Sequence, residues 1–284
     1  MNTTVSPPFH RLGLLTGEEV LRALSNTAVI VFGLGGVGGW AAEALVRSGI
    51  GRITIVDNDS VCITNINRQI QALSSTLGIP KAAALMKRLL DINPRCSIRA
   101  FNRAFTRESA NLFEIEGAAY VIDAIDSLSH KLDLIEMTAP LPAVLFSSMG
   151  MAARLDPARI KTADIWDTSG CPLAALVRRG LRKRGFTGHF TAVYSDEAPL
   201  RAGENQSPCG TDHCFCSAGD AGWCASKKQI NGSAVTVTAS AGMILASLVI
   251  RDLIRRTGNN GVSGSSEAVS AGLPRGSEKD QRRG

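Results

Sequence analysis

Unbroken apolar segments alternate with amphipathic ones through the first half of the chain. Helical periodicity at 38–48, at 80–92 and from Ser127 onward separates the apolar segments. A strand that is buried on both faces has no polar side, so such segments indicate a mostly parallel sheet covered by helices. The predicted strands are 28–32, 52–56, 96–102, 118–126 and 142–148.

The second half departs from this pattern. Strands are predicted at 159–165 and 189–195, on either side of a helix at 172–185, and a polar loop spans 196–230. Residues 233–250 contain no charge and predict a buried strand followed by a core helix. A membrane span is the alternative for this segment, because its length reaches the lower limit for crossing a bilayer.

The two ends of the chain differ from its centre. Residues 1–10 are expected to be flexible, and an amphipathic helix within 11–24 is expected to start after Thr16 as its N-cap. Residues 257–284 are rich in Gly, Ser and charge, which is typical of a disordered tail. A single domain is therefore predicted over 11–256, with mixed strands in its C-terminal part.

Composition adds a modest preference for anionic partners. The chain of 284 residues has 31 Lys and Arg against 25 Asp and Glu, a formal charge of +6. This excess permits a polyanion such as RNA without requiring one. The N-terminus shows no secretory signal, so the seven cysteines are expected to be thiols in a reducing cytoplasm.

A glycine-rich turn joins the first predicted strand to the first helix of the sheet. In Gly33-x-Gly35-x-x-Gly38, with Gly36 beside them, the glycines permit a tight turn, a close approach of backbone to phosphate, and helix packing. Phosphate then lies at the helix N-terminus. Asp57 ends the second strand, where a carboxylate can bind a ribose hydroxyl. This Rossmann-like pattern suits NAD and ATP equally.

The residues that follow Asp57 distinguish the two nucleotides. Several cations and amides cluster there, and a triphosphate needs such donors whereas hydride transfer has no use for them. Asp123 and Asp126 close the fourth strand at the edge where open sheets bind ligands, and Asp123 suits Mg²⁺. The expected nucleotide ligands in the loop and the next helix are Asp59, Asn65, Arg68, Gln69 and Lys81, with Asn67 beside them.

Taken in order, these motifs resemble a known family. The segments "FGLGGVGGWAAEAL", "VDND", "NINRQ", "GIPKAA" and "VIDAIDS" resemble the ThiF-type adenylating enzymes related to ubiquitin-activating enzyme. Within that group the chain is most similar to the tRNA threonylcarbamoyladenosine dehydratases, on the segments "HRLGLLTGEEVLRAL", "RLDPARIKTADI", "CPLAALVRRGLRKRG" and "VYSDE". The resemblance covers residues 10 to 256.

The resemblance implies roles for individual residues. The glycine loop would hold the phosphates of ATP, Asp57 the ribose and Asp123 Mg²⁺, with Arg68 and Lys81 on the triphosphate. Arg11 matches an arginine that, in relatives, reaches across a homodimer into the neighbouring site. The implied reaction adenylates the threonyl carboxylate of the modified adenosine beside the tRNA anticodon. A nitrogen of the same group then displaces AMP and closes a ring, with the net loss of one water.

A basic helix fits a tRNA substrate. Leu173, Leu176, Val177 and Leu181 form its expected apolar stripe, which leaves the cations to the other side. An exposed cationic face would bind backbone phosphates in a salt-dependent way, although a solvated helix face is the simpler interpretation. The candidate RNA-binding residues are Arg178, Arg179, Arg182, Lys183 and Arg184.

The cysteines leave an alternative open. Cys209, Cys214, Cys216 and Cys224 could bind structural Zn²⁺, but their spacing lacks the paired C-x₂-C motifs of zinc-bearing relatives, so free thiols are the other reading. Cys171 stands where relatives that activate sulfur carriers have a thiol. Adenylation of the Gly-Gly tail of a ubiquitin-like sulfur carrier, with a sulfur-transfer protein as partner, is therefore the alternative function. A non-catalytic tRNA- or partner-binding scaffold is a further alternative, against which the complete set of nucleotide ligands argues.

Overall fold

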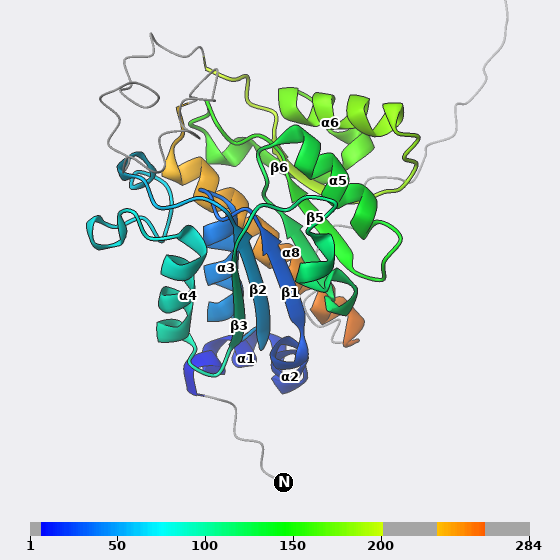
Figure 1. Cartoon of the computed structure of the whole chain (residues 1–284). Helices are drawn as coiled ribbons and strands as arrows, with labels where there is room; N and C mark the ends of the chain where they lie inside the picture. The colour runs from blue at the N-terminus through cyan, green and yellow to red at the C-terminus, as the bar shows by residue number, and fades with distance from the viewer. Residues whose placement is uncertain (1–6, 201–231, 259–284) are drawn as a thin grey trace, which may run out of the picture.

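A seven-stranded sheet forms the centre of the molecule, for which the computed structural model describes residues 7–200 and 232–258 (Figure 1). Its strand order is β3-β2-β1-β4-β5-β7-β6, and only β6 and β7 pair antiparallel. This confirms a mostly parallel sheet with mixed C-terminal strands. The strands are β1 (Ala28–Phe32), β2 (Arg52–Asp57), β3 (Ser97–Asn102), β4 (Tyr120–Asp123), β5 (Val144–Ser148), β6 (Ile160–Asp164) and β7 (Thr191–Ser195).

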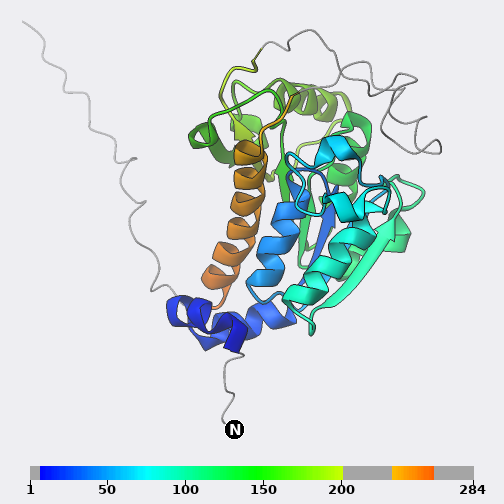
Figure 2. The same cartoon turned by 90° about the vertical axis from the view of Figure 1, so that its left-hand side faces the viewer.

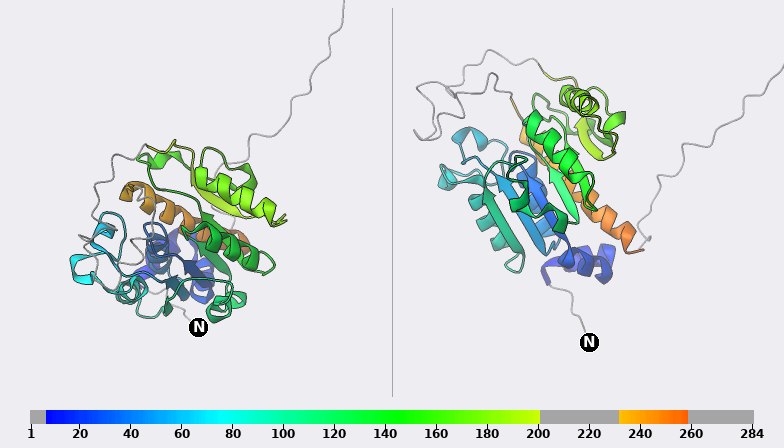
Figure 3. Two further views of the ribbon diagram at one scale, coloured as in Figure 1. Left: turned by 45° about the horizontal axis from the view of Figure 1, so that its top comes forward. Right: turned by 45° about the vertical axis from the view of Figure 1, so that its right-hand side comes forward.

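Helices cover both faces of the sheet. One face carries α3 (Gly38–Arg47), α4 (Lys81–Ile92) and α8 (Val235–Arg256), as Figure 2 shows. The other face carries α5 (Leu128–Thr138) and α6 (Pro172–Lys183), as the two views of Figure 3 show. Each layer encloses its own apolar cluster, so the central strands are buried on both sides and read as unbroken apolar sequence.

The strand order creates a crevice at one edge of the sheet. The chain passes from β1 to β2 on one side, whereas β4 lies on the other side of β1. The connections that leave β1 and β4 therefore diverge at the carboxyl ends of these strands, which is where open α/β sheets bind ligands. The glycine loop follows β1 and the two aspartates of "DAID" lie at the end of β4.

The N-terminal part is more regular than predicted. Residues Pro7–Phe9 form a 3₁₀ turn and α1 (His10–Thr16) begins within the segment expected to be flexible. Gly17, with φ +84, separates α1 from α2 (Glu18–Asn26). The Thr16 hydroxyl donates to the Leu12 carbonyl, so Thr16 ends α1 and does not cap the following helix.

The predicted strand near residue 233 is wrong, because α8 is helical from Val235 onward. Alternating Val and Thr suggest a strand there, but the buried positions follow helical spacing against α3. The Thr238 and Ser240 hydroxyls bond to the carbonyls four residues earlier. Among the described residues, α8 is the one helix long and apolar enough to cross a membrane, and its buried face favours a core helix.

Candidate active site

The glycine loop has the geometry that phosphate binding needs. Gly33 has φ +84, and a Cβ there would lie 2.6 Å from the Ala124 carbonyl oxygen. A Cβ on Gly38 would lie 1.9 Å from the Gly33 carbonyl oxygen, so a side chain cannot fit. Gly35 is open, with its nearest neighbour, the amide nitrogen of Gln69, 4.0 Å from its Cβ position. The loop therefore offers uncovered backbone at Gly35, beside the start of α3.

Side chains hold the Leu34 peptide of this loop from two sides. Its N–H donates to Asp57 Oδ2 at 2.6 Å, and its carbonyl accepts from Gln71 Nε2 at 2.5 Å. The other Asp57 oxygen accepts the Asp59 N–H at 2.8 Å. Burial raises the pKa of Asp57 and the nearby Lys81 ammonium opposes this. Asp57 thus shapes the loop itself, and its contact with a ribose stays a prediction.

Lys81 lies at the start of α4 and points toward the same carboxylates. Its Nζ is 2.7 Å from Asp59 Oδ2 and 4.0 Å from Asp57 Oδ1. The side chain is only 7% exposed, which excludes a fully solvated lysine at a helix end. A buried cation next to the loop has a phosphate-like anion as its natural additional partner.

The loop after β2 brings the remaining predicted residues to the glycines. The Arg68 Cγ atom would lie 3.3 Å from a Cβ on Gly36. The Arg68 guanidinium donates to Thr64 O and to Asn67 Oδ1. The Trp40 indole donates to the Arg68 carbonyl at 3.0 Å, which ties this loop to α3.

Asn65 and Gln69 have different surroundings in this loop. Asn65 Oδ1 accepts the Cys62 N–H at 3.1 Å, so this side chain shapes the loop. Gln69 is 6% exposed, its Oε1 accepts from Gln71, and its nitrogen is the atom nearest to open Gly35. Gln69 is therefore the amide best placed to reach a bound phosphate.

The two aspartates after β4 differ sharply in exposure. Asp123 is completely buried and its Oδ2 lies 2.6 Å from the Lys131 ammonium. Asp126 is exposed at the same strand end. The expected role of Asp123 as the Mg²⁺ ligand therefore does not suit its surroundings, because both of its oxygens have partners inside the protein. The residues that the structure describes contain no cluster of three or more potential metal ligands.

Arg11 is the predicted catalytic residue that the structure does not bring to the crevice. It lies on α1, below the amino ends of the strands, whereas the glycine loop lies at the carboxyl ends (Figure 1). Leu14 and Leu15 of the same helix are 75% and 68% exposed. Because residues 11, 14 and 15 are spaced by three and four, they share one exposed helix face.

The basic helix is α6, and its inner face differs in part from the prediction. Ala174, Val177 and Leu181 are buried, but Leu176 is 43% exposed. The cations line a shallow depression formed by Ala175, Arg178, Arg179, Arg182 and Lys183.

The predicted RNA-binding cations are not equivalent. Arg178 donates to the Thr168 hydroxyl, and Arg182 lies over the Trp166 ring. Arg184 is 2.7 Å from Asp133 and 2.9 Å from Glu136, and the hydrogen bond that it donates to Asp133 raises the pKa of its guanidinium. Arg184 is therefore committed to an ion pair with α5. Arg179 and Lys183 have no side-chain hydrogen bond or ion pair with the described residues.

The cysteine predictions have two outcomes. Cys171 precedes α6, is 4% exposed and has its sulfur 4.0 Å from the Gly150 carbonyl oxygen. It belongs to the apolar cluster under α5 and α6. A thiol buried in this way is poorly placed to react with a partner protein. Cys209, Cys214, Cys216 and Cys224 lie outside the described residues, so zinc binding there stays a prediction.

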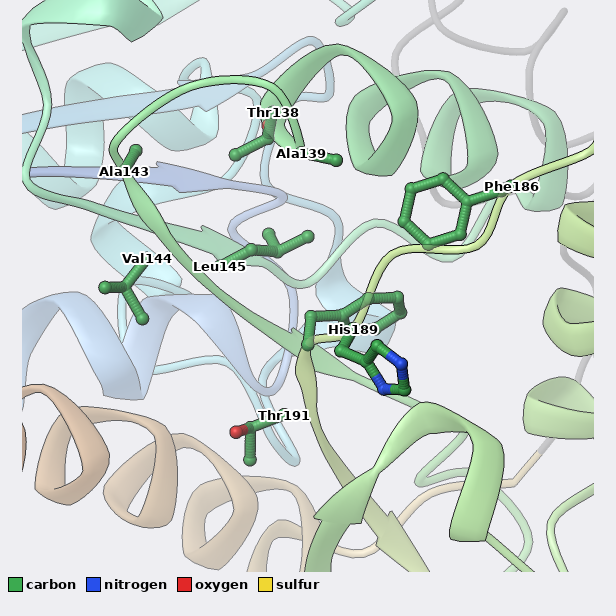
Figure 4. Close-up of a pocket in the computed structure, with 9 residues that line it drawn as sticks. Thr138, Ala139, Ala143, Val144, Leu145, Phe186, His189 and Thr191 are labelled. Carbon is green, nitrogen blue, oxygen red and sulfur yellow. The ribbon is translucent and has the colours of Figure 1, made fainter.

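A separate cavity of about 200 Å³ lies at the opposite end of the sheet (Figure 4). Val144 and Thr191, the first residues of β5 and β7, line it together with Phe186 and His189. None of the predicted nucleotide-binding residues reaches this cavity. The glycine-loop crevice, not this cavity, is the candidate active site.

Two residues near the crevice were missed in the sequence. Lys131 could have been found, because it occupies a buried position of α5 together with Leu134, Ile135 and Thr138, at helical spacing. A lone lysine on an otherwise buried helix face predicts an internal partner. Gln71 gave no such signal, because its partner is a backbone carbonyl distant in sequence.

Comparisons with known proteins agree with this geometry. The tRNA threonylcarbamoyladenosine dehydratase of Bacillus subtilis is 40% identical over 248 residues, covering 87% of this chain and 94% of the relative. The structure of the Escherichia coli tRNA N6-threonylcarbamoyladenosine dehydratase in complex with ATP has a TM-score of 0.74 and 31% identity, covering 91% of this chain and all of that one.

Molybdopterin-synthase adenylyltransferases match less of the chain. A molybdopterin-synthase adenylyltransferase of Salmonella typhimurium is 32% identical over 141 residues, which is 49% of this chain. The model of the ThiF family matches residues 10–269. The chain therefore belongs to the ThiF family.

Proposed function

We propose that this protein is an ATP-dependent dehydratase that cyclises N6-threonylcarbamoyladenosine in tRNA. The observation that carries the proposal is the open backbone at Gly35 with Gln69 beside it. Arg68 lies beside Gly36, and Lys81 lies beside Asp57, whose carboxylate accepts the Leu34 N–H of the same loop. This arrangement is suited to a triphosphate, and the dehydratase relatives cover almost the whole chain. An oxidoreductase that uses NAD(P) would leave these cations and amides without a role.

The chemistry requires charge and position more than acid–base groups. A threonyl carboxylate oxygen attacks the α-phosphorus of ATP, and pyrophosphate leaves. A nitrogen of the threonylcarbamoyl group then attacks the activated carbonyl carbon, and AMP leaves with the oxygen atom. The glycine loop and Lys81 orient the phosphates and stabilise their developing charge, which are the main contributions a protein can make to such a transfer.

Mg²⁺ fits this site through Asp126. Magnesium in nucleotide sites is held by one or two carboxylates together with phosphate oxygens, and it neutralises their charge. Asp126 is an exposed residue just after β4, two residues after Ala124, whose carbonyl oxygen lies against Gly33 of the glycine loop. We therefore assign to Asp126 the metal contact that the sequence suggested for Asp123.

The position of Arg11 supports a homodimer as part of this proposal. Because α1 lies at the end of the sheet away from the crevice, an Arg11 that contacts a bound nucleotide would do so in the site of a second chain. The exposed Leu14 and Leu15 beside it supply an apolar surface that a second copy would cover. In a twofold dimer, the most common soluble homo-oligomer, the two copies are equivalent, so if one Arg11 reaches the site of its partner, both do.

The tRNA substrate is assigned to the cationic face of α6. Arg179, Arg182 and Lys183 are exposed along it and can neutralise backbone phosphates. A tRNA substrate also places the reaction in the cytoplasm. The alternative substrate, a sulfur-carrier tail, is less favoured because Cys171 is buried and the adenylyltransferase relatives match only about half of the chain.

The proposal is tested by incubating the protein with Mg-ATP and tRNA that carries threonylcarbamoyladenosine. Nucleosides are then analysed by mass spectrometry under conditions that do not hydrolyse the ring. We expect an adenosine derivative lighter by one water that forms only with ATP. Pyrophosphate exchange that needs a protein with a Gly-Gly tail, without this product, would instead establish the sulfur-carrier alternative.

A further inference from the structure

A charged pair without contact to solvent lies directly beneath the crevice. The Lys131 ammonium of α5 is 2.6 Å from Asp123 Oδ2 at the end of β4, and both side chains are 0% exposed. The hydroxyl of Ser147 on β5, also fully buried, donates to the same oxygen at 2.6 Å. Removing two charges from water is costly, so such a pair is weak as a source of stability. A role in positioning explains it better.

The pair joins three elements of the fold. All three donors of the ammonium have an acceptor within reach, since Nζ also lies 3.3 Å from the Ser147 hydroxyl and 3.0 Å from the Ser148 carbonyl oxygen. Lys131 thereby connects α5 to the carboxyl ends of β4 and β5. The second oxygen of Asp123 accepts the Ile125 N–H at 3.0 Å. One oxygen of the Asp123 carboxylate is thus bonded to Lys131 and Ser147, and the other oxygen fixes the turn that follows β4.

That turn, residues 124–126, lies against the glycine loop. The Ala124 N–H donates to the Phe32 carbonyl at 2.8 Å. The Ala124 carbonyl oxygen is so close to Gly33 that a Cβ on Gly33 would lie only 2.6 Å from it. Asp126 is the exposed last residue of the turn. Any shift of the turn therefore changes the position of the Asp126 carboxylate relative to the phosphate-binding backbone.

We infer that Lys131 is a positioning residue, which acts through Asp123 and the 124–126 turn to fix the Asp126 carboxylate for a magnesium-bound nucleotide. Lys131 itself touches neither metal nor nucleotide. The inference rests on the proposed function, because it requires that the crevice binds Mg-ATP.

The test measures ATP binding by calorimetry over a series of Mg²⁺ concentrations for four proteins. These are the wild type, Lys131→Met, Asp126→Asn and the double variant. We expect Lys131→Met to raise the half-saturating Mg²⁺ concentration about tenfold, as is typical when a group that orients a metal ligand is lost. The affinity for metal-free ATP stays unchanged. The double variant shifts no further than Asp126→Asn alone, because both changes act through one carboxylate.

Tyr120→Phe is the matched control. Tyr120 is buried at the other end of β4 and donates to Asp252 at 2.8 Å, so its loss lowers the melting temperature without changing the Mg²⁺ dependence. The inference is overturned if Lys131→Met behaves like this control.

Should Lys131→Met fail to fold, Ser147→Ala removes an uncharged donor to the same Asp123 oxygen and must shift the Mg²⁺ dependence in the same direction. An unchanged dependence in Ser147→Ala then overturns the inference. A wild type that binds no ATP at any Mg²⁺ concentration would instead refute the proposed function, so the two failures are distinguishable.

Discussion

The Leu34 peptide shows how single residues prepare the glycine loop for a ligand. Its N–H and carbonyl are each held by a side chain from another segment, Asp57 and Gln71. The loop therefore does not need to become ordered when a phosphate arrives. A loop that is fixed beforehand avoids part of the entropy cost of binding.

This predicts a measurable role for Gln71. Gln71→Leu keeps the volume roughly constant and removes the bond to the Leu34 carbonyl together with the longer bond to Gln69 Oε1. The Gln71 Oε1 atom has no hydrogen-bond partner among the described residues to lose. Leaving that carbonyl unsatisfied costs about 1–3 kcal/mol, which we expect to weaken ATP binding as well as stability. Calorimetry of ATP binding and thermal unfolding measure the two effects.

Thr27→Val provides the comparison for Gln71→Leu. It removes a buried hydrogen bond to the Ala23 carbonyl just before β1, at the end of the strand away from the loop. We expect it to lower stability and leave ATP affinity unchanged. Equal ATP affinity in wild type and Gln71→Leu would show that Gln71 does not order the loop.

At the residue scale, the glycines of the turn could be predicted and the orientation of Asp123 could not. Gly33 and Gly38 are required by a local turn and by contacts within one short segment, which a sequence motif records directly. The direction in which a carboxylate points depends on partners far along the chain. Asp123 was expected to face a metal, but Lys131 and Ser147 hold it inside the protein.

At the scale of elements, the apolar pattern predicted the strands of the parallel sheet, because a strand that is buried on both faces has apolar side chains at consecutive positions. It failed only at the start of 233–250, where β-branched residues form the first turns of α8 in place of the predicted strand. Packing against α3 through Gly242, whose Cβ position lies 2.5 Å from the Val37 carbonyl oxygen, overrides their intrinsic preference. Local propensity cannot report such a contact.

The α6 helix supports a prediction at this scale. Replacing Arg179, Arg182 and Lys183 by Ala should weaken tRNA binding and reduce the slope of log affinity against log salt by about 2 to 3, one phosphate contact for each cation. ATP binding should stay unchanged. Filter binding at several salt concentrations measures the slope.

Arg184→Ala is the control on the same helix end. It removes the same charge, but from a side chain that is already paired with Asp133 and Glu136. We expect it to lower stability and to leave the salt slope at the wild-type value. If Arg184→Ala and the triple variant change the slope equally per charge, α6 contributes only general electrostatic attraction.

At the scale of the whole molecule, the sequence placed Arg11 in the site by resemblance alone, whereas in the fold it lies at the opposite end of the sheet. The sheet separates α1 from the glycine loop by the length of its strands (Figure 1). No hydrophobic pattern reports which end of a sheet a helix will occupy in relation to a site. The arrangement of two chains is therefore a question for experiment.

Subunit mixing tests whether Arg11 acts on the site of a second chain. Arg11→Ala keeps an intact crevice but lacks the arginine, whereas Lys81→Ala has a damaged crevice but retains Arg11. Each alone should be nearly inactive. When equal amounts are unfolded and refolded together, half of the dimers are mixed and carry one complete site, so about a quarter of wild-type turnover should return. Mixing without exchange should restore nothing. If Arg11 acted within its own chain, or only stabilised α1, refolding the two together would give no more activity than their average, and the assignment of Arg11 to the neighbouring site would be wrong.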